Sequence, residues 1–226
     1  MKMTGIGSLP FKNSNEAENF SLRHHLPFIP ELPQLQENFL LNSSEELIER
    51  LKMYDNITNK PQFKVQLIGP ITYKHMNQNS ERKIDYHQIL NEILSSLTKI
   101  KNSTHQTIYV QLDEPIPPTD FQEQSQLENV MRIITSLEFL VVVHSCQKIQ
   151  FDFFPEWPTA YLALDLNLNP EFSLNQKLLI AGIDPRLDKI NTQAEFVSFT
   201  CGMGLLTMDD CEEIYQKLSE TIKNSP

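Results

Sequence analysis

A short apolar run followed by a polar or turn-forming cluster recurs eight times along this chain of 226 residues. Several runs are nearly continuous stretches of β-branched residues or leucine, such as Phe139–Val143. Runs of this kind are typical of strands that are buried on both faces of a parallel sheet. The eight expected strands are Met3–Leu9, Leu26–Leu32, Phe63–Ile71, Thr107–Asp113, Glu138–His144, Thr159–Asp165, Lys177–Asp184 and Glu195–Cys201.

Apolar residues also recur with helical spacing between several of these strands. Helices are expected over Asp85–Lys101, around residues 127–134 and from near Thr207 onward. Ser43 and Glu46 form a capping box ahead of a further apolar stretch. The connections after the fifth, sixth and seventh expected strands are short and marked by proline, so the helices there should be short or missing.

Alternating strands and helices predict an α/β protein with a parallel sheet. Eight such units predict a compact (β/α)8 (TIM) barrel with several short or missing helices, formed by residues 1–226 as a single domain. A doubly wound open sheet is the alternative. No GxGxxG or GxxxxGK(S/T) motif follows any expected strand, which removes the commonest reason to prefer that alternative.

Charge and cysteine content argue against several classes of protein. The formal net charge is −10 and the chain has no basic run, which argues against nucleic acids or anionic membranes as partners. No apolar stretch approaches the roughly 20 residues of a transmembrane helix, and no signal peptide is recognisable, so we expect a cytoplasmic protein. Cys146, Cys201 and Cys211 are an odd number of cysteines, which favours metal binding or a free thiol over a disulfide framework.

Polar or metal-ligating residues follow nearly every expected strand. In a parallel barrel the carboxyl ends of the strands meet at one face, where the active sites of this fold lie. His144 and Cys146 share one side of an extended chain, because side chains alternate with a period of two. With Cys201 they could form a zinc site that leaves a fourth position open for substrate. The other residues at strand ends are Ser8, Glu31, Thr72, Asp113, Glu114, Asp165 and Asp184.

A structural interpretation is open for these residues as well. A cysteine near a strand end is often a small buried hydrophobic residue. Asp113 and Glu114 precede Pro115 and could end a strand and begin a turn. Ser8 could cap a helix. Spacing alone therefore leaves both a zinc site and a site without metal open.

Five segments resemble, in this order, the catalytic domain of cobalamin-independent methionine synthase. They are similar as well to the wider superfamily that contains uroporphyrinogen decarboxylase and the zinc methyltransferases of methanogens. The segments are spread over nearly the whole chain, and the fold that the resemblance implies is again a TIM barrel. They are GIGSLP (5–10), LIGPITY (67–73), VQLDEP (110–115), VVHSC (142–146) and CGMGLLT (201–207).

The resemblance implies a zinc site. His144, Cys146 and Cys201 match the family's metal ligands. The family's fourth ligand is a glutamate after the next strand, where this chain has Asp165. Aspartate is one methylene shorter, so the loop would have to shift for its oxygen to reach the metal.

The resemblance also implies a substrate site for an amino-acid thiol such as homocysteine. Ser8 would bind the carboxylate of this thiol and Asp113 its ammonium group, with Glu31 assisting. Asp184 stands near the place of the family's acid–base histidine, for which this chain has no clear match.

The activity implied by the resemblance is zinc-assisted methyl transfer to a thiol. A free thiol has a pKa of about 8.5, and zinc coordination deprotonates it and holds the thiolate for attack on a methyl group. We expect no folate-binding N-terminal domain, which favours a corrinoid such as methylcobalamin, or a docked corrinoid protein, as the methyl donor. The alternatives are a metal-free decarboxylase-like enzyme and a degenerate barrel that binds a small molecule or a partner without catalysis.

Overall fold

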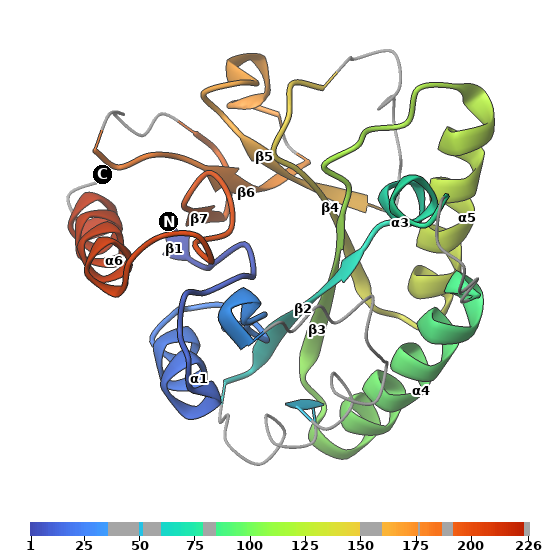
Figure 1. Cartoon of the computed structure of the whole chain (residues 1–226), viewed down its shortest axis with the longest axis horizontal. Coiled ribbons are helices and arrows are strands. Elements are labelled where there is room, and N and C mark those ends of the chain that lie inside the picture. The colour runs from blue at the N-terminus through green and yellow to red at the C-terminus, as the bar shows by residue number, and fades with distance from the viewer. Residues whose placement is uncertain are drawn as a thin grey trace.

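A computed structural model describes residues 1–35, 50–51, 60–78, 85–149, 160–175, 177–186 and 192–223. Within these ranges, seven parallel strands form one curved sheet (Figure 1). Their order in the sheet is β1-β7-β6-β5-β4-β3-β2, so the strands follow the chain from β2 to β7 and β1 pairs with β7. The strands are β1 Lys2–Met3, β2 Gln62–Ile68, β3 Thr107–Asp113, β4 Leu140–Ser145, β5 Ala160–Asp165, β6 Leu178–Gly182 and β7 Phe196–Ser198.

Helices surround the sheet on its outer side (Figure 1). The N-cap side chains Asn13, Asp85 and Asp120 accept backbone hydrogen bonds and define where α1, α4 and α5 begin. None of the described helices is both long and apolar enough to span a bilayer. The α-helices are α1 Ser14–Leu22, α3 Pro70–Met76, α4 Tyr86–Thr104, α5 Phe121–Ser136 and α6 Met208–Lys223, and two short 3-10 turns are η1 Pro33–Leu35 and η3 Pro170–Phe172.

The sheet is not the complete (β/α)8 barrel expected from the sequence, and that prediction is wrong. The second expected strand, 26–32, makes only isolated parallel bridges to its neighbours. Pro27 and Pro30 have no N–H group to donate, so a continuous ladder cannot form along this segment. The α/β class and the parallel sheet agree with the prediction, and the sequential strand order differs from that of a doubly wound sheet. The bridges join Thr4 to Leu26, Ser8 to Glu31 and Phe28 to Lys64.

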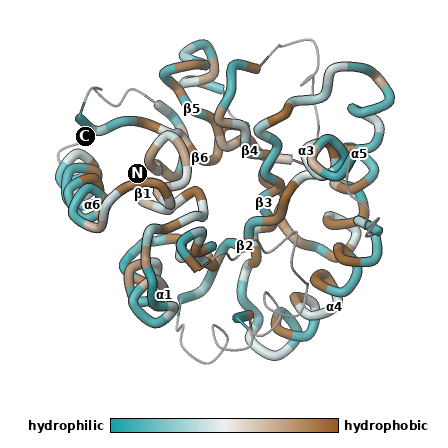
Figure 2. Tube along the Cα trace, in the orientation of Figure 1, coloured by the Kyte–Doolittle hydropathy of each residue, from teal (hydrophilic) through white to brown (hydrophobic). Residues whose placement is uncertain are grey.

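Apolar side chains form separate layers on the two faces of the sheet. One outer cluster packs α4 and α5 against β2, β3 and β4, and another packs α1 and α6 against β1, β5, β6 and β7. A smaller inner cluster includes Tyr109, Val142, Ala163 and Phe196. In Figure 2 hydrophobic residues are concentrated on the strands, whereas the helices alternate between hydrophobic and hydrophilic. The inner face of the sheet therefore carries fewer buried apolar residues than the outer face. Buried polar side chains such as Lys64 and Gln111 occupy part of it.

The register of the sheet aligns the carboxyl ends of three strands. Ile68 of β2 pairs with Asp113 of β3, and Asp113 pairs with His144 of β4. Since side chains alternate along a strand, Gln111 and Asp113 face the same side of β3. The predicted helix cap at Ser43 and Glu46 lies outside the described residues.

Candidate functional site

A group of four side chains, called here the strand-end cluster, lies where the sheet register brings β3 and β4 to the same level. It consists of Asp113, His144, Cys146 and Cys201. His144 is buried, Asp113 and Cys146 are partly buried, and Cys201 is exposed in the loop after β7. All four were expected at strand ends from the sequence.

One side of the His144 ring is fixed by the backbone of the neighbouring strand. Its Nδ1 lies 3.0 Å from the carbonyl oxygen of Ala163 in β5. A carbonyl oxygen can only accept, so Nδ1 carries the proton and Nε2 is left to other partners. A histidine ligand of a metal is commonly oriented in this way, by a hydrogen bond from the other ring nitrogen.

The two thiols of the cluster interact with each other and with His144. Hydrogen bonding with Cys146, and then with His144, holds the pKa of Cys201 well below its ordinary value. The same contact with Cys201, together with burial, raises the pKa of Cys146. The pair of thiols therefore loses its first proton more readily than an isolated cysteine does, and its second less readily.

Asp113 brings a carboxylate to the same place. Burial raises the pKa of Asp113, while the nearby charges of His144 and Lys64 and a hydrogen bond from Gln111 oppose this shift. The amide nitrogen Nε2 of Gln111 donates to Oδ1 of Asp113 at 2.6 Å. The carboxylate is thus oriented from within the protein and lies in the electrostatic field of the thiols.

Lys64 and Gln111 form a buried polar pair beneath Asp113 that sequence reasoning missed. The Nζ of Lys64 donates to Oε1 of Gln111 and to the carbonyl oxygen of Ile6, each at 2.7 Å. Both side chains are 0% exposed. A usable signal was present in the sequence, because Lys64 and Gln66 interrupt an otherwise apolar strand at alternate positions.

Ser8 lies against the loop that follows Cys201. Its hydroxyl accepts from the backbone N–H of Gly204 at 3.3 Å, and its carbonyl accepts from that of Met203 at 2.8 Å. Glu31 adjoins Ser8 through a backbone bridge, and its N–H donates to the carbonyl of Gly7 at 3.2 Å. Two of the three predicted substrate-binding residues, Ser8 and Glu31, are therefore neighbours of each other, and Ser8 is next to the loop that carries Cys201.

Asp165 and Asp184, the other two predicted site residues, take part in local interactions. Oδ1 of Asp165 accepts from the N–H of Asn167 at 2.8 Å in a turn after β5. Asp184 accepts two hydrogen bonds from the Arg186 guanidinium, at 2.8 Å from Nε and 2.7 Å from Nη2, which lowers its pKa. The roles assigned to Asp165 as a metal ligand and to Asp184 as an acid–base group stay predictions.

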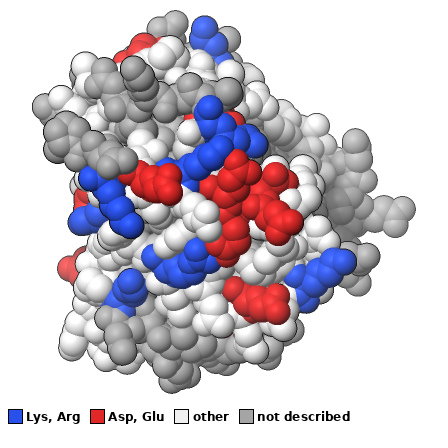
Figure 3. All heavy atoms as spheres, turned by 90° about the vertical axis from the view of Figure 1, so that its left-hand side faces the viewer, with Lys and Arg blue, Asp and Glu red and all other residues white. Residues whose placement is uncertain are grey.

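The surface near Asp184 carries paired charges. Figure 3 shows acidic and basic side chains side by side on the face that carries α6. Arg23 binds Glu212 with 2.9 Å between Nη2 and Oε2, and Lys217 lies 2.6 Å from Glu213.

A pocket of about 470 Å³ opens between β1 and the end of α6, and none of the predicted site residues lines it.

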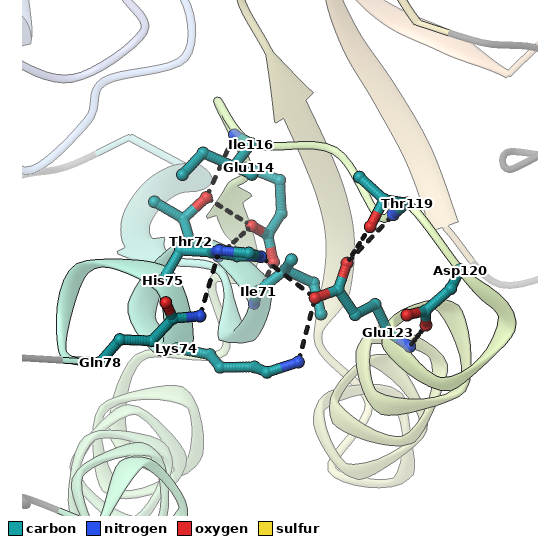
Figure 4. A network of polar contacts seen from close by, with 10 residues as sticks. All are labelled: Ile71, Thr72, Lys74, His75, Gln78, Glu114, Ile116, Thr119, Asp120 and Glu123. Atoms are coloured by element: carbon teal, nitrogen blue, oxygen red, sulfur yellow. Dashed lines mark hydrogen bonds and ion pairs between the residues drawn. The ribbon is translucent and has the colours of Figure 1, made fainter.

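A second polar network joins the loops after β2 and β3 (Figure 4). Glu114 accepts from the N–H groups of Ile71 and Thr72, both at 2.9 Å. Glu123 accepts from Lys74 at 3.0 Å, from His75 at 3.1 Å and from Thr119. Glu123 ties α3 to α5 and Glu114 ties α3 to the end of β3, so the network has a structural role.

The donor set of the strand-end cluster fits zinc in kind. One imidazole with its second nitrogen tied to a carbonyl, and two thiols in contact, are ligands that zinc prefers. With the side chains as they stand, no three histidine, cysteine or carboxylate groups among the described residues have the spacing of a metal site.

No protein-family model matches the chain, and no curated protein is significantly similar to it. Two solved structures show a distant likeness. A proposed phosphonomutase from Burkholderia cenocepacia J2315 has 10% identity and a TM-score of 0.39, over 81% of this chain and 67% of that one. A GH36 α-galactosidase from Geobacillus stearothermophilus has 13% identity and a TM-score of 0.28, over 77% of this chain and 32% of that one. Likenesses this weak carry no argument about activity.

Proposed function

We propose that this chain is a zinc-dependent enzyme that activates a thiol for methyl transfer. The observation that carries the proposal is the contact among His144, Cys146 and Cys201, with Nδ1 of His144 held by Ala163. Three protein ligands leave one tetrahedral position for a substrate sulfur. The ordered motifs that resemble the zinc methyltransferases point to the same chemistry.

Bound zinc would favour deprotonation of the substrate thiol and hold the resulting thiolate, which is the methyl acceptor, for attack on the methyl group of the donor. The chain's own residues would bind the rest of the substrate. Asp113 offers a carboxylate to an ammonium group, and it lies within electrostatic reach of Cys201. The Ser8 hydroxyl accepts from Gly204 and keeps its own proton to donate to a substrate carboxylate. An amino-acid thiol such as homocysteine has the three groups that this arrangement would take.

The methyl donor in this proposal is a corrinoid, either methylcobalamin or a corrinoid protein at the strand-end face. The compartment is the cytoplasm, where thiols remain reduced and available for metal binding. Glu31 adjoins Ser8 through a backbone bridge and would support the substrate carboxylate site indirectly, by fixing the position of Ser8.

Zinc stoichiometry tests the proposal. Purified protein reconstituted with zinc under reducing conditions should hold about one ion per chain. The Cys146→Ser, Cys201→Ser double variant should hold almost none. Cys211→Ala is the matched control, because Cys211 is buried in α6 among apolar residues and should not affect uptake.

The same samples separate the alternatives. Adding homocysteine to the zinc-loaded protein should release about one proton per site and bring an extra sulfur into the zinc X-ray absorption spectrum. Equal and negligible zinc in the wild type and the double variant would refute the metal site. Binding of a carboxylated substrate without zinc would then favour the decarboxylase-like alternative, and no turnover of any kind would favour a binding protein.

A further inference from the structure

Lys64 is a fully buried lysine in the middle of β2, the last strand in the order of the sheet. Its Nζ donates to the carbonyl oxygen of Ile6 and to Oε1 of Gln111, and lies 5.7 Å from the centre of the Phe28 ring. Burial lowers the pKa of Lys64 to about 7, against the opposing influence of Asp113. Burying an ammonium group costs several kcal/mol unless good partners compensate. An apolar residue at this position would avoid this desolvation cost. The presence of Lys64 therefore calls for an explanation.

Gln111 connects Lys64 to the strand-end cluster. Its Oε1 accepts from Lys64, while its Nε2 donates to Oδ1 of Asp113 at 2.6 Å and to the Ile6 carbonyl at 3.0 Å. An ammonium group can only donate and a carboxylate can only accept, so these two neighbours determine which way the amide points. The result is a continuous and directional chain of hydrogen bonds from Lys64 to Asp113.

We propose that Lys64 is a positioning residue that acts through Gln111 to orient the Asp113 carboxylate toward the ammonium group of an amino-acid thiol. This inference rests on the proposed function. Asp113 accepts from Gln111 at one carboxylate oxygen and retains its second oxygen for the substrate. Lys64 itself is 0% exposed and would not touch the substrate.

The same chain of bonds reaches the turn that carries Ser8. The Ile6 carbonyl accepts from both Lys64 and Gln111, and Ile6 lies two residues before Ser8. The polar pair therefore links the position of Asp113 to that of the GIGS turn. Replacing Lys64 should leave the apolar layers of the sheet intact. It should remove the hydrogen bonds that fix the positions of Asp113 and Ser8 relative to each other.

Two ligands distinguish a positioning role from a structural one. Homocysteine has an α-ammonium group, and 4-mercaptobutanoate is the same thiol acid without it. If Lys64 orients Asp113, Lys64→Met should weaken binding of homocysteine to the zinc-loaded protein about tenfold and change that of 4-mercaptobutanoate less than about twofold, as measured by calorimetry. A general loss of structure would weaken both ligands alike.

Further variants sharpen the comparison. Asp113→Asn should reproduce the selective loss, and adding Lys64→Met to it should have little further effect, because both changes remove the same interaction. Gln111→Met breaks the chain at its middle and replaces Lys64→Met if that variant does not fold. Lys2→Met is the control, because Lys2 makes an exposed ion pair with Glu195 at the start of β1.

The possible outcomes separate this inference from the proposed function. Selective weakening of homocysteine by Lys64→Met and Gln111→Met, with unchanged zinc content, supports the positioning role. Unchanged homocysteine affinity, or equal weakening of both ligands, overturns it while the wild-type binding leaves the proposed function in place. A zinc-loaded wild type that binds neither thiol overturns both.

Discussion

Glu114 and Thr72 are joined by two hydrogen bonds to a single carboxylate oxygen. The N–H of Thr72 donates to Oε2 of Glu114 at 2.9 Å, and the Thr72 hydroxyl donates to the same atom at 2.7 Å. Glu114 follows β3 and is 0% exposed, whereas Thr72 lies in the first turn of α3. This contact fixes the start of α3 against the end of β3, next to the strand-end cluster.

The stability of the protein should depend on the ionisation of Glu114. Burial, opposed by hydrogen bonds from Thr72 and Ile71, raises its pKa from 4.5 to about 7. The folded chain then binds this proton more tightly than the unfolded chain, so the stabilisation is complete below about pH 4.5 and is lost as the pH rises toward 7. In urea unfolding, the free energy of unfolding of Glu114→Gln should rise relative to that of the wild type as the pH increases from about 5 to about 8.

The control for this prediction is Glu128→Gln. Glu128 lies 3.8 Å from Arg132 on the surface of α5, and replacing it should change the free energy of unfolding little at any pH in this range. A constant difference between the wild type and Glu114→Gln across the range would contradict the raised pKa.

Glu123 should behave in the opposite way. Burial would raise its pKa, but hydrogen bonds from Thr119, Lys74 and His75 outweigh burial and lower the pKa from 4.5 to about 2. The stabilisation is therefore present above about pH 4.5 and is lost as the pH falls toward 2. Glu123→Gln should cost about 1–3 kcal/mol near neutral pH, measured by urea unfolding, and the cost should shrink in acid. A cost that stays the same down to acid pH would count against these ion pairs.

Gly202 lies so close to Ser8 that a side chain at this position would require Ser8 to shift. A Cβ atom there would lie 2.1 Å from Oγ of Ser8, which is closer than any real contact. Gly202→Ala should therefore destabilise the fold by about 1–3 kcal/mol in thermal or urea unfolding. Combining it with Ser8→Ala removes the obstructing oxygen and should restore part of the loss. If the double variant is no more stable than Gly202→Ala, the strain lies elsewhere.

Asp184 is ionised and paired with Arg186, which bears on its predicted acid–base role. Hydrogen bonds from Arg186 lower the pKa of Asp184, so the group has no proton to give at neutral pH. We expect Asp184→Asn to leave zinc uptake and homocysteine affinity unchanged and to cost at most about 1 kcal/mol in stability, since the pair is partly solvated. A loss of thiol affinity, measured by calorimetry, would instead bring Asp184 into the site.

Local sequence patterns predicted most of the strands. The run Thr107–Asp113 is both the expected strand and β3, and the runs for β4, β5 and β6 differ from the structure by one or two residues at their ends. Asp85 was expected to begin a helix and is the N-cap of α4. These agreements follow because a buried strand or a capped helix is specified by neighbouring residues in the chain.

The predictions that failed involve either neighbours distant in the sequence or a weak local pattern. Phe63–Ile71 was expected as one strand, but Pro70 begins α3, whose first turn is held by Glu114. Helix α1 was not predicted, because its buried residues include only Ala17 and Phe20 among apolar ones. Segment 26–32 was expected as a strand but forms only isolated bridges. A continuous ladder would need N–H groups that its prolines lack and would depend on the position of β2.

The sequence by itself determined that Asp113, His144, Cys146 and Cys201 would follow strands of a parallel sheet, because strand ends and turn residues are local features. Only the tertiary structure decided what each group contacts. It placed Nδ1 of His144 against the carbonyl oxygen of Ala163, joined Lys64 to Gln111 across two strands and brought Glu114 to Thr72. Hydrogen bonds and pKa shifts depend on distances across strands that are far apart in the chain, and strand register sets those distances.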